Sequence, residues 1–263
     1  MADLFYSARL TLVHAQQHIQ NFNMLVNDFV NGHPWSHIVD EDSQSGQHIH
    51  KIKFTRQLPQ MLPCILFDIA SNLRAALDQA GYAATVASGN IKLEKTNFPF
   101  ADSLANLNNN IDGPRNVCRD LPPEITAIFR GFKPYKGGND PLWALNKLCN
   151  TKKHCALVPL QIGSATVFFV SDVIGDNWSS STVSPNSFGL GWNPEKNEIT
   201  LTTTPPGVTP KITADVAFNI AIEGIETIVG EQATHVLHAM SGIVERVLMA
   251  TEAECRRLRF QIE

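Results

Sequence analysis

The sequence predicts one α+β domain, with long N- and C-terminal helices packed with inner helices against an antiparallel β-sheet. Apolar residues recur at helical spacing near both ends of the chain, and short strand-like segments between them are joined by connections too short for helical crossovers. The chain has 263 residues, of which 43% are hydrophobic and 17% charged, and no repeat or linker divides it. We therefore treat residues 1–263 as a single domain.

The first thirty residues carry the clearest helical pattern. Apolar side chains follow steps of three and four: Phe5, Ala8, Leu12, Ala15, Ile19, Phe22, Val26 and Phe29. This spacing predicts one apolar seam on a helix that ends at Asn31-Gly32. Residues 232–258 repeat the pattern, with Glu252 and Arg256 spaced for an ion pair. Because each seam must be buried, we expect the two terminal helices to pack together.

The next part of the chain predicts a hairpin followed by a helix. Residues 32–56 contain two β segments around a polar turn, with Ile52 and Phe54 on one face. Residues 58–84 have helical periodicity. The predicted apolar face of this helix is Leu62, Ile65, Leu66, Ile69, Leu73, Ala76, Leu77 and Ala80. Residues 86–121 are expected to be loop-rich, with the Asn run of residues 106–114 acting as a breaker.

Two short helices and a set of strands complete the prediction. One helix spans about 123–132, and Asp140-Pro141 supplies an N-cap residue and a proline for a second, helical from Leu142 onward. After His154 the chain contains strand-like segments that predict an antiparallel meander. The polar loop near 175–197 is expected to be the most mobile segment.

Composition excludes several classes of protein. Five scattered cysteines without a CxxC pair predict reduced thiols and a cytoplasmic chain. The N-terminus lacks a signal-peptide pattern, and no apolar run is long enough to span a membrane. A net charge of −4 gives no general attraction to nucleic acid. Hydrolase, dinucleotide and P-loop motifs are absent and the paired histidines lack companion carboxylates, so we expect no cofactor and no metal site.

The segment "LCNTKKHCAL", residues 148–157, holds the strongest candidate for a reaction centre. If the helix from Asp140 continues, Asn146, Asn150, Lys153 and His154 form one polar stripe. Asn can hydrogen-bond a phosphate, Lys can hold an anion, and His can transfer a proton near neutral pH. The alternative is that Lys153 and His154 only complement the negative end of the helix dipole.

A second candidate cluster interrupts the apolar helix of residues 58–84. Asn72, Arg74 and Asp78 lie there, and the last two are spaced as an (i, i+4) ion pair. Such a pair is often architectural. The functional interpretation is that Asp78 holds the Arg74 guanidinium toward an anionic ligand.

The chain resembles a bacterial family over residues 35–160. "SNLRAALDQAGYA", "FPF", "KPY", "PLW" and "NTKKH" are similar to a pattern in which an NLRxxLDH helix precedes an FP element and an N-x-x-K-H element. Gln79 stands where that pattern often has His. The resemblance itself implies no activity.

Residues 149–154 also resemble the RNxxxH motif of the HEPN family, helical proteins that include metal-independent ribonucleases. That resemblance implies that His154 acts at a scissile phosphodiester and that Asn150 orients it. Cys149 stands where the family has Arg, so Lys153 or Arg74 would contact the phosphate. The strands after His154 depart from the all-helical HEPN core.

Two functional interpretations follow. The first is a non-catalytic ligand- or partner-binding module, and the alternative is a HEPN-like metal-independent ribonuclease or other phosphodiester-acting enzyme. The enzyme requires Asn150, Lys153 and His154 to lie near Arg74 in one concave site. We also predict a homodimer, because long apolar seams favour pairing, and RNA or another phosphate-bearing molecule as the ligand.

Overall fold

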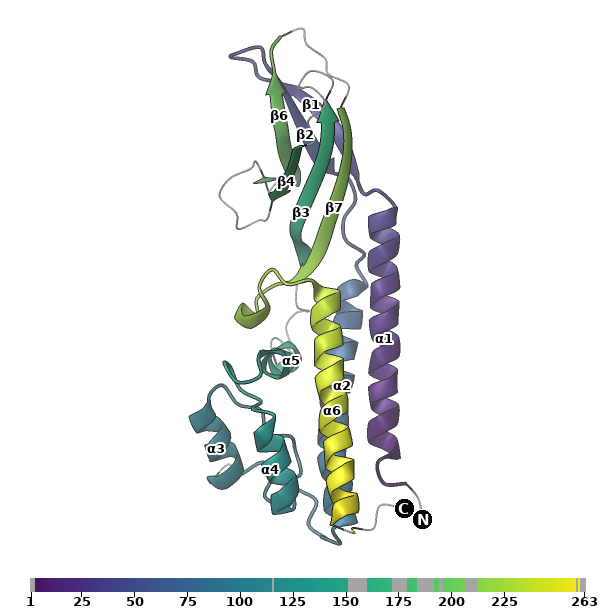
Figure 1. Ribbon diagram of the computed structural model, residues 1–263, viewed down its shortest axis with the longest axis vertical. Helices are drawn as coiled ribbons and strands as arrows, with labels where there is room; N and C mark the ends of the chain where they lie inside the picture. Colours follow the sequence, from purple (N-terminus) through teal and green to yellow (C-terminus); the bar gives the residue numbers. More distant parts are fainter. Residues whose placement is uncertain are drawn as a thin grey trace.

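The computed structural model describes residues 3–114, 116–150, 160–171, 179–183, 192–193, 196–206, 212–258 and 260. The molecule is elongated, with the helices gathered at one end and the strands at the other (Figure 1). This arrangement confirms the predicted α+β class. The long helices extend away from the strands instead of lying across a sheet face.

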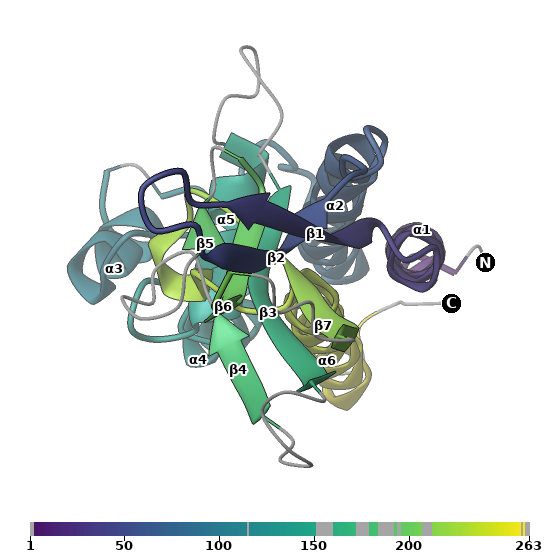
Figure 2. The same cartoon turned by 90° about the horizontal axis from the view of Figure 1, so that it is seen from above.

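Three long helices in the described part of the chain run side by side (Figures 1 and 2). They are α1 (Tyr6–Asn31), α2 (Leu62–Ala87) and α6 (Ala233–Arg257). All eight predicted seam residues of the first helix are buried, and Phe22 and Val247 have no exposed area. The Asn23 amide nitrogen lies 3.0 Å from His238 Nε2, and Arg9 pairs with Glu252 at 3.0 Å. The predicted packing of the terminal helices is confirmed.

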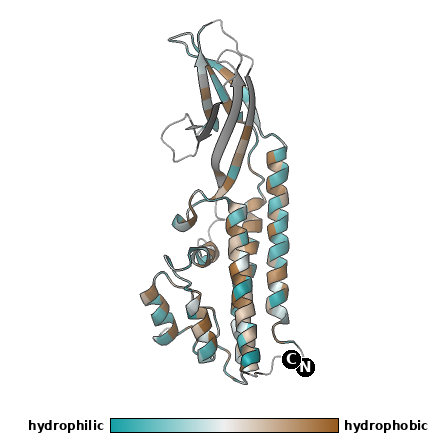
Figure 3. Cartoon of the chain, viewed as in Figure 1, coloured by the Kyte–Doolittle hydropathy of each residue, from teal (hydrophilic) through white to brown (hydrophobic). Residues whose placement is uncertain are grey.

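The central helix α2 is buried around most of its circumference, because it contacts α1, α5 and α6. The outer helices are amphipathic, and Figure 3 shows apolar and polar residues alternating along them. One end of α6 is held by the predicted pair of Glu252 with Arg256, at 2.5 Å.

The shorter helices include one that the sequence did not predict. They are α3 (Leu104–Asp112), α4 (Pro123–Gly131), α5 (Asp140–Asn150) and the 3-10 turn η1 (Glu226–Ile228). The Asn run predicted as a breaker forms most of α3, so that prediction was wrong. Ser103 Oγ accepts a hydrogen bond from the Asn106 backbone N–H at 3.2 Å, which caps the helix. Leu107 and Ile111, four residues apart, are both buried and anchor it.

The described strands form two antiparallel sheets. One has the order β1-β2-β6-β5 and the other β4-β3-β7. Their bounds are β1 (Trp35–Glu41), β2 (His48–Phe54), β3 (Leu160–Ser171), β4 (Ser179–Val183), β5 (Trp192–Asn193), β6 (Glu198–Thr204) and β7 (Ile212–Ile222). The predicted hairpin of residues 32–56 is confirmed as β1 and β2. The predicted meander is corrected, because β6 leaves the later strands and pairs with β2.

Side chains explain why β6 joins the hairpin. Ile52 of β2 and Ile199 of β6 are fully buried and are paired across the two strands. Glu198 of β6 accepts from Lys53 at 3.1 Å and from Lys51 at 3.3 Å, which fixes the register. A small second core forms in this way between the sheets.

Phe218 of β7 joins the helical and the β parts of the molecule. Its ring meets Phe29, near the end of α1, edge to face at 5.9 Å, and Phe54, at the end of β2, at 5.2 Å. Phe218 therefore packs against both the main core and the smaller core between the sheets.

Candidate functional site

The candidate site lies where α2 faces α5. Arg74 of α2 donates from Nη1 to Asn146 Oδ1 at 2.8 Å and to Asn150 Oδ1 at 3.0 Å. The Asn150 amide also donates to Asn146 Oδ1 at 2.8 Å. Asn146 and Asn150 share one side of α5 because they are four residues apart. Two residues from one predicted cluster therefore bind the guanidinium of the other.

Asp78, one turn after Arg74, links this arrangement to the FPF segment. Its Oδ1 accepts from the Phe98 backbone N–H at 2.8 Å, while its Oδ2 lies 4.0 Å from Arg74 Nε. The predicted Arg74–Asp78 pair is present, at the outer limit of an ion pair. The ring of Phe100, in the same segment, has the guanidinium carbon 5.3 Å from its centre, as in a cation–π contact.

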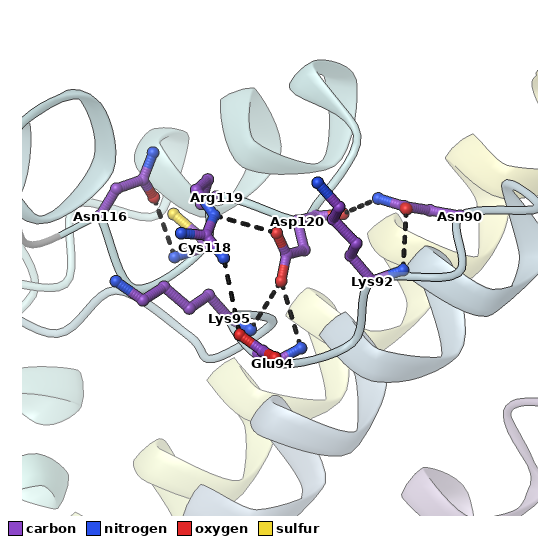
Figure 4. Close-up of polar contacts among 8 residues, drawn as sticks. All are labelled: Asn90, Lys92, Glu94, Lys95, Asn116, Cys118, Arg119 and Asp120. Atoms are coloured by element: carbon purple, nitrogen blue, oxygen red, sulfur yellow. Dashed lines mark hydrogen bonds and ion pairs between the residues drawn. The ribbon is translucent and has the colours of Figure 1, made fainter.

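Asp120 fixes the shape of the loop that leads to the FPF segment (Figure 4). Its carboxylate accepts from the backbone N–H groups of Glu94 at 3.1 Å and Lys95 at 2.9 Å, and from Arg119 Nε at 3.2 Å. The Lys95 bond contributes most to lowering the pKa of Asp120 below its usual value. The loop at residues 94–95 is thereby held to the segment around Asp120.

Gly81 allows the loop to approach α2 closely. A Cβ built on Gly81 would lie 2.2 Å from the Thr96 carbonyl oxygen, far inside van der Waals contact. Only glycine fits there without a backbone shift. The distance between α2 and the FPF segment, and hence the position of Phe100 beside Arg74, depends on this residue.

The neighbouring cation on α5 is already paired. Lys147 lies 2.7 Å from Asp102, which also accepts from Trp143 Nε1 at 2.9 Å. The hydrogen bond from Lys147, followed by that from Trp143, lowers the pKa of Asp102. Arg74 differs from Lys147, because its closest contacts are neutral amide oxygens and its ion pair with Asp78 is longer, at 4.0 Å.

The predicted site residues fall into three groups. Arg74, Asp78, Asn146 and Asn150 come together. Asn72 does not join them, since its amide donates to the Asp68 carbonyl oxygen of its own helix at 2.8 Å. Lys153 and His154 lie outside the described residues, as does most of the loop predicted to be mobile, 175–197.

Sequence reasoning missed Phe100, whose ring lies beside Arg74, and the aromatic and acidic residues near it that contact Asp78 and Lys147. Phe98, Phe100 and Trp143 belong to the "FPF" and "PLW" motifs, but the pattern assigned them no role. The only sequence signal for these three residues was that their motifs belong to the same family-like pattern as "NLR". Asp102 had no distinguishing pattern at all.

Other reactive groups in the described ranges offer less. No cluster of three or more His, Cys, Asp or Glu residues there has a geometry that would hold a metal ion. Burial raises the pKa of Cys118 to about 11 and that of Cys255 to about 12, so neither thiol is a ready nucleophile at neutral pH.

Comparison with known proteins adds no relative: no family model, curated protein or solved structure matches the chain. The helices in the described ranges include none with the length and apolar character needed to cross a membrane.

Proposed function

We propose that the protein is a non-catalytic ligand-binding module in which Arg74 receives a phosphate group of its ligand. The observation that carries this proposal is that neutral groups hold the Arg74 guanidinium in place. Asn146 and Asn150 hold its Nη1 atom, its carbon lies over the Phe100 ring, and the nearest carboxylate oxygen among the described residues is 4.0 Å away. A cation in this state is oriented without being neutralised by a close ion pair.

The chemistry of the guanidinium favours phosphate. Arginine carries five N–H donors in a planar fork that matches the oxygens of a phosphate, and it stays charged at all physiological pH values. Within the described residues, Arg74 Nη2 has no hydrogen-bond partner. The Asn150 side chain is exposed and adds an amide beside it. The site therefore offers N–H donors that the described residues do not use.

Calorimetric titration with adenosine monophosphate and with inorganic phosphate tests the proposal. Arg74→Gln should weaken nucleotide binding by about ten- to a hundredfold, the effect of losing hydrogen bonds to a charged group. Arg246→Gln is the matched control, because Arg246 is an exposed arginine on α6, and it should bind like the wild type.

A purely architectural Arg74 would give a different result. Arg74→Gln would then lower the melting temperature while neither probe distinguished it from the wild type. Equal binding by Arg74→Gln and Arg246→Gln, or no binding of either probe by the wild type, contradicts the proposal.

A HEPN-like metal-independent ribonuclease, or another phosphodiester-acting enzyme, is the second candidate. It is favoured by the 3.0 Å bond between Arg74 and Asn150, because Arg74 then supplies the cation that Cys149 cannot. His154 follows Asn150 by four residues and would act at the phosphodiester. Cleavage of an RNA pool in EDTA by the wild type, lost in His154→Ala and in Arg74→Gln, would favour the enzyme over the binding module.

We also propose a homodimer and a cytoplasmic location. The seams that first suggested pairing are buried within one chain, so the proposal now rests on the apolar residues left exposed on the outside of α1. These are Tyr6, Leu10, Val13 and Met24. Light scattering measures the association state directly.

The cytoplasmic location rests on the scattered cysteines.

A further inference from the structure

A groove separate from the Arg74 site lies at the junction of the helices and strands. Its volume is about 660 Å³, within the usual range for small-molecule sites. The connection from β2 to α2, residues 55–61, forms one wall, and the turn at residues 196–197 and the start of β3 contribute the rest. Its described lining is Lys53 to Gln60, Leu62, Pro63, Leu160, Ile162, Lys196 and Asn197.

Backbone hydrogen bonds and prolines hold the walls of this groove. The Phe54 N–H donates to the Asn197 carbonyl oxygen at 2.9 Å, which joins the two walls. The Thr55 N–H donates to the Pro34 carbonyl oxygen at 2.8 Å. Pro59 and Pro63 restrict the connection further. A groove formed in advance loses little entropy when a ligand binds.

The charged residues in the lining are all cations. Lys53, Arg56 and Lys196 line the groove, and no Asp or Glu is among its described lining residues. This is unusual in a chain whose net charge is −4. The groove is therefore a local concentration of positive charge on a chain that is negative as a whole.

Only part of this charge is compensated. Lys53 pairs with Glu198 at 3.1 Å, and Glu198 is shared with Lys51. Arg56 donates to the Gly32 carbonyl oxygen at 3.4 Å and lies over the Phe29 ring. The exposed ammonium of Lys196 makes no close ion pair in the described ranges; its charge reaches Asp40, whose close partner is Lys51.

The apolar lining indicates what else the ligand carries. Leu58, Leu160 and Ile162 are half-buried, and each leaves some apolar surface in the groove. The only aromatic residue in the described lining is Phe54, which is 6% exposed and offers no stacking platform. Single-stranded nucleic acid sites depend on such platforms, so a nucleic acid fits this groove poorly.

We infer that the groove between the β2–α2 connection and the 196–197 turn binds a small amphiphilic anion, an aliphatic body with a phosphate or carboxylate head. The head lies against Lys196 and Arg56, and the aliphatic part lies over Leu58 and the start of β3. This site is independent of Arg74 and of the function proposed for it.

Calorimetric titration of the whole chain with decyl phosphate, kept below its micelle concentration, tests the inference. Arg56→Gln with Lys196→Gln should weaken binding by about tenfold or more, because two cations facing one anion are removed. Leu58→Ser should also weaken it, by about threefold or more. Decanoate should bind and lose affinity in the same variants, while decanol should bind at least about tenfold more weakly than decyl phosphate.

Two controls locate the effect. Lys92→Gln removes an exposed lysine from a distant loop, and Arg74→Gln removes the cation of the other site; both should bind decyl phosphate like the wild type. The inference is overturned if the wild type does not bind, if decanol binds as tightly, or if the Arg56/Lys196 variant keeps its affinity. Melting curves for each variant confirm that the fold is intact. A loss in Arg74→Gln alone would assign the ligand to the other site.

Discussion

At the scale of single residues, a few contacts decide how the candidate site is assembled. Arg74 binds amides on another helix in preference to the carboxylate one turn away, and Asp78 instead holds the backbone of Phe98. Gly81 lets that backbone reach α2. The geometry of the site therefore depends on the absence of a side chain at Gly81 as much as on the polar side chains of Arg74 and Asp78.

Gly81→Ala tests this dependence. Its methyl group would lie 2.2 Å from the Thr96 carbonyl oxygen, so the loop must move and the protein should lose about 1–3 kcal/mol of stability. Gly242→Ala is the control, because the nearest atom to its methyl is the end of Arg246 at 3.6 Å. That variant should gain about 0.5–1 kcal/mol from helix propensity. Denaturant unfolding gives both values, and equal effects would contradict the close approach.

The sequence predicted part of the site, and the reason for the shortfall is geometric. Spacing within one helix identified Arg74 with Asp78 and Asn146 with Asn150, because helical periodicity is local. The contact of one pair with the other depends on how α2 packs on α5, which no spacing encodes. Asn72 illustrates the same limit, since its position in the cluster with Arg74 and Asp78 did not reveal that its amide bonds its own helix.

At the scale of elements, apolar anchors outweighed unfavourable composition. The Asn run became α3 because Leu107 and Ile111 are buried and Ser103 caps the helix. Residue propensity alone predicted a loop. The hairpin β1–β2 was predictable because its two strands are adjacent in the sequence, whereas the partner of β2, strand β6, lies far along the chain.

The sheet of β1, β2 and β6 carries a histidine pair that should make stability depend on pH. His37 Nε2 lies 3.2 Å from His50 Nδ1, and His50 Nε2 lies 3.2 Å from Thr204 Oγ1. Burial lowers the pKa of His37; burial, followed by the charges of His37 and His48, lowers that of His50. The unfolded chain, with histidine pKa values near about 6.5, then takes up protons first.

The stability contributed by this pair should be fully present above about pH 6.5, the unfolded value, and should be lost as the pH falls below it through the lowered folded pKa values. Carboxylates such as Asp40, whose pKa is lowered chiefly by its hydrogen bond from Lys51, lose their contribution only below about pH 4. Unfolding free energies measured across this range check the expectation. His37→Gln with His50→Gln should flatten the curve, and an unchanged slope in that variant would assign the effect elsewhere.

At the scale of the whole molecule, α1 and α2 from the first part of the chain and α6 from its end form one shared core. The α+β class and the pairing of the first and last helices were predictable from seam periodicity, since a long apolar stripe has to be covered. The division into two sheets was not, because strand order depends on contacts between distant segments.

Phe22→Ala measures the energy of this core. Phe22 is fully buried between helices, so the substitution should cost about 3–5 kcal/mol. Met24→Ala, two residues away and 58% exposed, should change stability by less than about 0.5 kcal/mol. Chemical denaturation of the two variants gives the comparison, and similar values for both would show that the seam faces solvent.

The Phe218 contact has a consequence for how the molecule melts. The Phe218 ring packs on Phe29 of the helical part and on Phe54 of the β part. If either part unfolds, apolar surface of the other part becomes exposed to water. The two ends of an elongated molecule are thereby made cooperative, and heat should unfold them in a single calorimetric transition.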